Sequence, residues 1–194
     1  MSAREVRSYR QAMRVTQHQV EGLVVINPEV HEDSRGFFVE SFNQRAFEQA
    51  TGVEADFVQD NHSRSTKGVL RGLHYQLPQA QGKLVRCARG SVIDVVVDIR
   101  ASSPTFGKSV VMELSEDNFR QLWVPEGFAH GFLVTSDVAD LLYKTTDYYT
   151  PESSHTIAWD DSELGIAWPL DGAQPIVSTG DAKGATLADA VLFP

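Results

Sequence analysis

The fold of this chain is constrained most by a series of short runs rich in β-branched and aromatic residues, each ended by glycine, proline or a cluster of Asp and Ser. Residues 91–100, SVIDVVVDIR, show the pattern most clearly, because alternate Ile and Val residues share one face of an extended chain while Asp94 and Asp98 fall on the other. Similar runs occupy residues 22–30, 36–42, 108–115, 120–127, 130–136 and 140–149. Strands at this spacing predict an all-β protein, an antiparallel sandwich or jelly roll.

Helical patterns are few. Residues 43–52, NQRAFEQATG, have helical spacing between a possible cap, Asn43, and a glycine stop, Gly52, and predict one short helix. Residues 183–193, KGATLADAVLF, suggest a second. The sequence has neither a Gly-rich dinucleotide fingerprint nor a P-loop, and it lacks the helices of a doubly wound fold.

The length and composition predict a single domain. The chain has 194 residues, of which 42% are hydrophobic, enough to build a sizeable core. The first seventeen residues are polar and weakly patterned, so we expect them to be loosely structured. We therefore expect an N-terminal extension over residues 1–19 and one folded domain over residues 20–194.

Charge and cysteine content narrow the class of protein. The net charge of −9 disfavours nonspecific nucleic-acid binding, and an anionic ligand would need local arginines to overcome it. Every apolar run is too short for a membrane span, and the N-terminal arginines are not followed by the apolar stretch of a secretory signal. The single cysteine, Cys87, excludes an intrachain disulfide. We expect a cytoplasmic protein that binds neither membranes nor nucleic acid.

Residues 69–86, VLRGLHYQLPQAQGKLVR, place charged groups inside a strand–turn–strand pattern. His74 interrupts the first apolar run and Lys83 opens the second, across a turn. A strand histidine is more often a satisfied core or surface residue, and a hairpin lysine is often solvated. The alternative is that both face one cavity from adjacent strands, where imidazole carries protons and ammonium stabilises an anion.

Other polar residues add to this possibility. Tyr143 is a packing residue or, beside a cation, a general acid. Arg35, Arg71 and the pair Gln59 and Asn61 are turn or surface residues, or planar contacts for a phosphate. In an ideal strand Arg71 and His74 point to opposite faces, unless Gly72 marks a bulge.

Two motifs resemble those of the cupin superfamily, a β jelly roll with an internal pocket. Gly68-x5-His74-x-Gln76 has the outline of the first motif, and residues 125–130, PEGFAH, have the outline of the second. A metal-binding cupin supplies several His and one Glu here, but Gln76 replaces the second histidine and no Glu follows at the expected place. Only His74 and His130 remain as good ligands, so we expect a site without metal or other cofactor.

A closer resemblance is to the dTDP-4-dehydrorhamnose 3,5-epimerase family, a branch of the cupins. It runs from about Val20 to the C-terminus and is carried by residues 33–43 (DSRGFFVESFN), 57–65 (FVQDNHSRS), 69–76 (VLRGLHYQ), 80–100, 103–107 (SPTFG), 120–132 (RQLWVPEGFAHGF) and 142–149 (LYKTTDYY). The resemblance implies a homodimeric enzyme, without cofactor, that inverts C3 and C5 of a dTDP-linked 4-keto-6-deoxyhexose.

The resemblance also implies residue roles. His74 would be the base, Lys83 would stabilise the enolate, Tyr143 would be the acid and Asp181 would orient His74. Asp181 lies in VSTGDAKG and would otherwise be an ordinary turn residue. The residues implied to contact the nucleotide sugar are Arg35, Glu40, Gln59, Asn61, Arg71, His130 and Tyr149.

The chain departs from the family pattern at two positions. Ser154 stands where many relatives carry Glu, and Gly180 where many carry Lys. Both positions are associated with ligand binding. Three alternatives therefore stay open: a C3-only epimerase or keto-isomerase acting on a related sugar, a metal-dependent cupin oxygenase, and a non-catalytic sugar-nucleotide binding protein.

Overall fold

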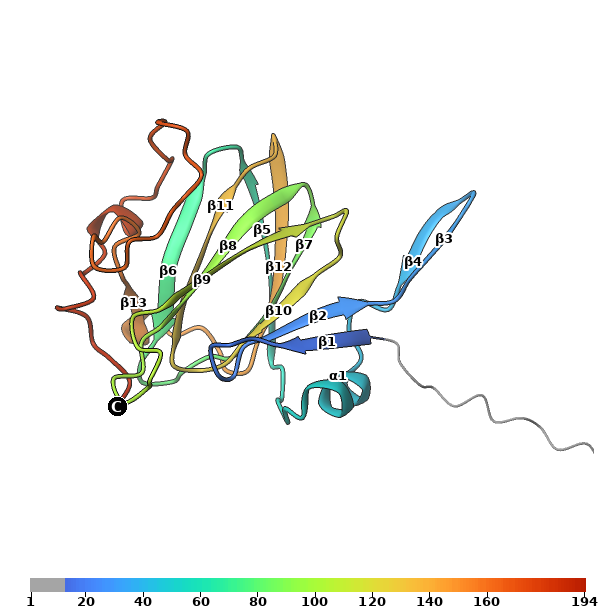
Figure 1. Cartoon of the computed structure of the whole chain (residues 1–194), viewed down its shortest axis with the longest axis horizontal. Helices are drawn as coiled ribbons and strands as arrows, with labels where there is room; N and C mark the ends of the chain where they lie inside the picture. Colours follow the sequence, from blue (N-terminus) through green and yellow to red (C-terminus); the bar gives the residue numbers. More distant parts are fainter. Residues whose placement is uncertain (1–12) are drawn as a thin grey trace, which may run out of the picture.

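Two antiparallel sheets packed face to face form the body of the computed structural model, which describes residues 13–194 (Figure 1). The six-stranded sheet has the order β1 (Met13–Gln17), β2 (Val24–Pro28), β10 (Gln121–Val124), β7 (Lys83–Arg89), β12 (Val138–Thr145), β5 (Gln59–Thr66). The five-stranded sheet has the order β13 (Ser154–Thr156), β6 (Leu70–Gln76), β11 (Phe128–Val134), β8 (Ser91–Asp98), β9 (Ser109–Ser115). The prediction of an all-β antiparallel fold is confirmed.

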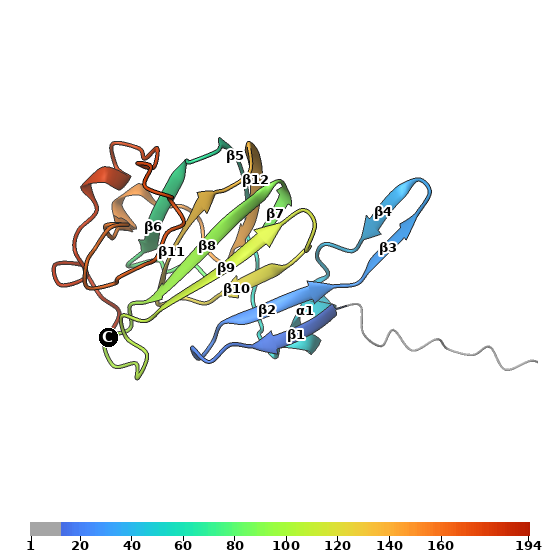
Figure 2. The same ribbon diagram turned by 45° about the horizontal axis from the view of Figure 1, so that its top comes forward.

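The remaining elements lie at the margins of the sandwich. The hairpin of β3 (Val30–Asp33) and β4 (Gly36–Val39) projects away from both sheets (Figure 2). The helix α1 (Gln44–Thr51) packs below β1 and β2, and two 3-10 helices, η1 (Pro151–Ser153) and η2 (Asp181–Lys183), lie in the C-terminal third. No helix among residues 13–194 is long and apolar enough to span a membrane.

The core follows from the alternation seen in the sequence. Side chains from both sheets meet in it, with Val85 and Leu141 from the six-stranded sheet against Val92, Leu114 and Phe132 from the five-stranded one. This burial of apolar surface supplies the main driving force for the sandwich.

The local signals of α1 are confirmed. The Asn43 side chain accepts a hydrogen bond from the Ala46 backbone at 3.1 Å, and Gly52 ends the helix in the left-handed conformation with φ +74°. The expected second helix at residues 183–193 is wrong. Gly184 packs against the Ala158 backbone, and Ala185 and Phe193 pair with separate segments, so the apolar side chains there serve different contacts.

The N-terminal expectation needs one correction. Residues 13–17 form β1, paired with β2 from Met13 opposite Pro28 to Gln17 opposite Val24, where loose structure was expected. Met13 and Val15 pack against the cluster that contains Phe47. The rest of the predicted extension, residues 1–12, lies outside the described residues.

Candidate active site

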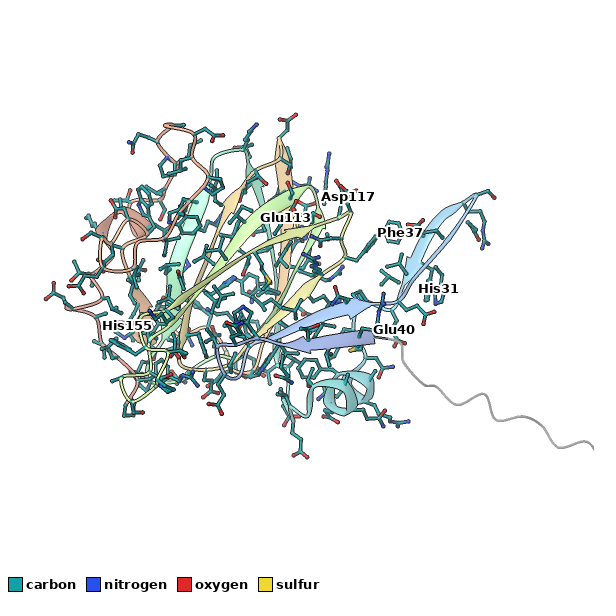
Figure 3. The ribbon with its side chains drawn as sticks, in the orientation of Figure 1. His31, Phe37, Glu40, Glu113, Asp117 and His155 are labelled. Carbon is teal, nitrogen blue, oxygen red and sulfur yellow. The ribbon has the colours of Figure 1, made fainter. Side chains whose placement is uncertain are left out.

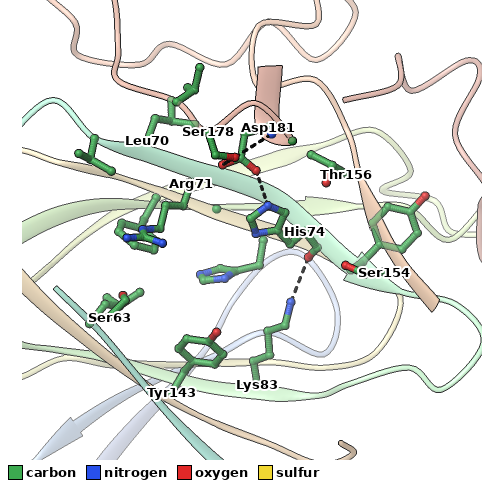
Figure 4. Close-up of a pocket in the computed structure, with 18 of the residues that line it drawn as sticks. Ser63, Leu70, Arg71, His74, Lys83, Tyr143, Ser154, Thr156, Ser178 and Asp181 are labelled. Carbon is green, nitrogen blue, oxygen red and sulfur yellow. Dashed lines mark hydrogen bonds and ion pairs between the residues drawn. The ribbon is translucent and has the colours of Figure 1, made fainter. Parts of the chain in front are cut away.

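A cavity of about 600 Å³ opens between the two sheets and the C-terminal segment (Figure 4). Its walls come from β6 and β11 on one side, β7 and β12 on the other, and residues 176–181 at the edge. Seven of the eleven site residues expected from the sequence line it: Arg71, His74, Lys83, His130, Tyr143, Tyr149 and Asp181. Both family departures, Ser154 and Gly180, line it as well.

His74 and Asp181 form a hydrogen-bonded pair although they are 107 residues apart. The His74 Nε2 and Asp181 Oδ1 atoms are separated by 2.5 Å, and the Ser178 hydroxyl donates to the other carboxylate oxygen at 2.9 Å. Burial would raise the pKa of Asp181, but the hydrogen bonds and charge of its neighbours hold it below its usual value. The ionised carboxylate therefore accepts the Nε2 proton and leaves Nδ1 of a neutral imidazole free to act as a base.

Lys83 begins β7 and is buried beside His74. Its ammonium donates to the His74 main-chain carbonyl at 3.0 Å. Burial lowers the pKa of Lys83 to about 8, while the negative charge of Asp94 opposes the fall. The group is thus a cation near neutral pH that has lost most of its water shell, which strengthens its interaction with an anion.

Tyr143 faces His74 from the opposite wall. It belongs to β12 in the six-stranded sheet, whereas His74 belongs to β6 in the five-stranded one, and the two side chains converge on the same space (Figure 4). Burial raises the pKa of Tyr143, against the charge of Arg71. The phenol therefore stays protonated and can donate a proton.

The Gly72 region explains how Arg71 and His74 share a wall. His74 pairs with His130 and Arg71 with Phe132, so three steps along β6 match two along β11 and one extra residue is accommodated. Gly72 has φ +124°, and a Cβ there would lie 2.5 Å from the Gly131 Cα atom. The bulge at Gly72 considered from the sequence is confirmed.

We expect Gly72→Ala to lower the stability by about 3 kcal/mol, because it combines a strained φ with a backbone clash. It should also lower kcat/KM about 100-fold by displacing Arg71 and His74. Gly36→Ala is the matched control, since Gly36 has φ +121° but open space around its added Cβ. Thermal denaturation and steady-state kinetics of both variants test this, and equal stability of the two would contradict it.

A second histidine–carboxylate pair lies deeper in the cavity. His130 on β11 donates through Nε2 to the Asp94 Oδ2 atom on β8 at 2.8 Å, and the other Asp94 oxygen has no hydrogen-bond partner among the described residues. Sequence reasoning did not identify Asp94 or Ser178 as part of the site. The available signal for Asp94 was an aspartate within an otherwise apolar strand.

The other expected residues lie outside this cavity. Gln59 donates to Asn61 at 2.9 Å and accepts from the Tyr149 backbone at 3.0 Å, while Asn61 borders a separate cavity of about 400 Å³. Arg35 is at the tip of the β3–β4 hairpin, paired with Asp33, and its side chain is 88% exposed. Glu40 lies at the base of the same hairpin (Figure 3). A single chain does not bring Arg35 and Glu40 to the cavity.

Metal binding has little support in the described part of the chain. Between residues 13 and 194 there is no group of three or more His, Cys, Asp or Glu side chains placed to hold a metal ion. The two cavity histidines are each engaged with a carboxylate. The expectation of a site without cofactor stays a prediction.

Comparison with known proteins gives one consistent match. Residues 17–189 match the family model described as dTDP-4-dehydrorhamnose 3,5-epimerase. The enzyme of that name from Pseudomonas aeruginosa is 56% identical over 182 residues, covering 94% of this chain and 100% of the relative. The one from Shigella flexneri is 54% identical over 182 residues, covering 93% and 99%.

Solved structures agree with the sequence comparison. The dTDP-6-deoxy-D-glucose-3,5-epimerase of Legionella pneumophila, in complex with dTDP-4-keto-L-rhamnose, superposes with a TM-score of 0.89 at 51% identity, covering 92% of this chain and 95% of that one. A 3′-monoepimerase of Streptomyces bikiniensis, in complex with dTDP-quinovose, superposes with a TM-score of 0.83 at 37% identity, covering 88% and 86%.

Proposed function

The chain belongs to the dTDP-4-dehydrorhamnose 3,5-epimerase family, and we propose that the cavity around His74 is where its reaction occurs. The enzyme inverts C3 and C5 of dTDP-4-dehydro-6-deoxy-D-glucose and gives dTDP-4-dehydro-L-rhamnose. The C4 ketone of this substrate acidifies the hydrogens on both neighbouring carbons, so each inversion can proceed by removal and return of one proton.

Each proposed step uses a group of the cavity. Nδ1 of His74 takes the proton from carbon, and the electrons of that C–H bond move into the ring to place a negative charge on the ketone oxygen. The Lys83 ammonium stabilises this enolate. Tyr143 then gives its proton to the carbon from the opposite face, which restores the ketone with inverted configuration.

The observation that carries the assignment is the placement of base and acid on opposite walls. His74, oriented by Asp181, comes from the five-stranded sheet and Tyr143 from the six-stranded sheet, with the buried ammonium of Lys83 beside them. A sugar ring held between the two walls presents one face to each group. Inversion requires this arrangement, because a base and acid on one wall would return the proton to its original face.

Proton NMR of dTDP-4-dehydro-6-deoxy-D-glucose with the enzyme in D2O, with a chelator present, tests the function. We expect deuterium at both C3 and C5 and a rhamno-configured product. Deuterium at C3 alone would place the activity with the monoepimerases, and exchange that requires added metal would contradict the metal-free site.

In the same assay we expect Tyr143→Phe to separate exchange from inversion. Without the phenol, His74 still removes and returns the proton on its own side, so the recovered substrate should carry deuterium but keep its configuration. Loss of a general acid is expected to lower the rate of epimerisation on the order of 10²–10⁴-fold. Normal inversion by this variant would exclude Tyr143 as the acid.

We further propose a cytoplasmic homodimer. The β3–β4 hairpin projects from the molecule, and its Phe37 and Phe38 are 61% and 68% exposed, as expected of a surface that packs on another chain (Figure 2). A second subunit would also provide the route by which Arg35 and Glu40 reach a cavity. The free thiol of the buried Cys87 is consistent with a reducing compartment.

A further inference from the structure

Gln76 lies at the end of β6, two residues beyond His74, and its buried carboxamide is fully used. The Nε2 group donates to the Gln79 carbonyl at 2.8 Å and to the Tyr148 carbonyl at 3.2 Å. The Oε1 atom accepts from the Thr150 backbone at 2.8 Å. All three partners are main-chain atoms, so the side chain holds the positions of two loops.

Both loops border the mouth of the cavity. One connects β6 to β7, and its Gln81 lines the cavity; the other follows β12, and its Tyr149 lines the cavity. A second glutamine holds the same segment, because Gln59 Oε1 accepts from the Tyr149 backbone at 3.0 Å. The consecutive residues 148–150 are therefore fixed by two glutamine side chains, while Tyr149 itself is 58% exposed at the opening.

We infer that Gln76 is a positioning residue that fixes the Tyr148–Thr150 segment so that Tyr149 forms the wall against which the sugar binds. The inference rests on the proposed function and extends it to a residue outside the proton-transfer set. Only a carboxamide supplies two donors and one acceptor from a single flexible side chain. Glutamate has the same shape but no donor, and a carboxylate would repel the carbonyls of Gln79 and Tyr148.

The role also gives a physical reason for glutamine at this position of the cupin motif. A histidine at residue 76 would supply one neutral ring N–H donor, so it could not hold the Gln79 and Tyr148 carbonyls together. In this chain the position serves the shape of the cavity mouth.

Gln76→Glu tests the inference by kinetics and by hydrogen–deuterium exchange of the main-chain amides. We expect kcat/KM to fall on the order of 10–100-fold, mainly through a higher KM, because a wall of the site is displaced. The amides of residues 148–150 should lose protection while those of β12 keep theirs. Gln76→Met, which removes the same hydrogen bonds without burying a charge, should change KM and protection in the same direction.

Gln121→Glu is the matched control. Gln121 is also buried and donates through Nε2 to one carbonyl, that of Ser41 at 2.8 Å, but it borders a different cavity. This variant should lose stability while keeping the wild-type KM. A general loss of stability alone therefore does not produce the expected result.

A double variant distinguishes action through Tyr149 from a separate effect. If Gln76 acts by placing Tyr149, Gln76→Glu should change KM less than twofold once Tyr149→Ala is present. Multiplicative effects, or unchanged KM and protection in Gln76→Glu and Gln76→Met, would overturn the inference. If the wild type catalysed no exchange in D2O the proposed function would fail, whereas amide protection of residues 148–150 would still decide whether Gln76 holds the segment.

Discussion

His74→Asn is expected to lower kcat on the order of 10²–10⁴-fold, because it removes the general base of both half-reactions. Asparagine still offers a side-chain N–H to Asp181, so the pocket should keep its fold and its affinity for the nucleotide sugar. Deuterium incorporation from D2O should therefore disappear at C3 and C5 together. Proton NMR of the sugar, with calorimetric measurement of dTDP binding, measures the two effects separately.

The matched control is His155→Asn. His155 lies on the neighbouring strand β13, donates to the Leu77 carbonyl at 2.9 Å and stacks on Tyr75. Because that contact is structural, the variant should retain deuterium exchange at both carbons. Continued exchange in His74→Asn at either carbon would show that another group removes that proton.

Lys83→Met is expected to lower kcat on the order of 10²–10³-fold, the usual effect of removing one stabilising group from a developing oxyanion. Methionine preserves the length of the side chain but carries no charge. Steady-state kinetics measures the loss, and Lys144→Met is the control. Lys144 pairs with Asp60 at 2.9 Å near the outer cavity, so its replacement should leave kcat unchanged.

The same lysine should determine the alkaline limit of activity. Its ammonium is the active form, and its pKa is about 8, so kcat of the wild type should fall as the pH rises through that value. Stability should change in the opposite direction. Because the folded pKa is below the usual 10.5, the charged form is disfavoured by folding, and this penalty is present below about pH 8 and disappears towards pH 10.5. Lys83→Met should accordingly keep its stability at pH 7, and a kcat that does not respond to this variant would remove the proposed role.

The parts of the fold set by neighbouring residues were predictable. Alternation in residues 91–100 and the caps of the helix at Asn43 and Gly52 are local signals, and the structure has both elements there. The strand β1 was missed because its stability comes from pairing with β2 and packing on Phe47. The helix expected at residues 183–193 fails because pairing with distant segments outweighs its helical spacing.

The site shows the same division. His74 and Lys83 attracted notice because charged groups interrupt apolar strands, whereas Asp181 was found only through resemblance, since nothing local connects it with a histidine 107 residues away. Asp94 and Ser178 have roles only through partners that the fold supplies. The position of Arg71 depended on the bulge at Gly72, and therefore on the close approach of Gly131.

The hydrogen bond from Lys83 to the His74 carbonyl makes two functions genetically separable. Because the lysine is tethered to the main chain of the base, any side chain introduced at position 74 leaves that tether available. Proton abstraction can then be deleted without dismantling enolate stabilisation. A displacement of the β6 backbone, in contrast, moves the base and the cation in concert. Substitutions at residue 74 thus dissect the reaction into its parts, whereas substitutions at Gly72 affect the catalytic apparatus as one unit.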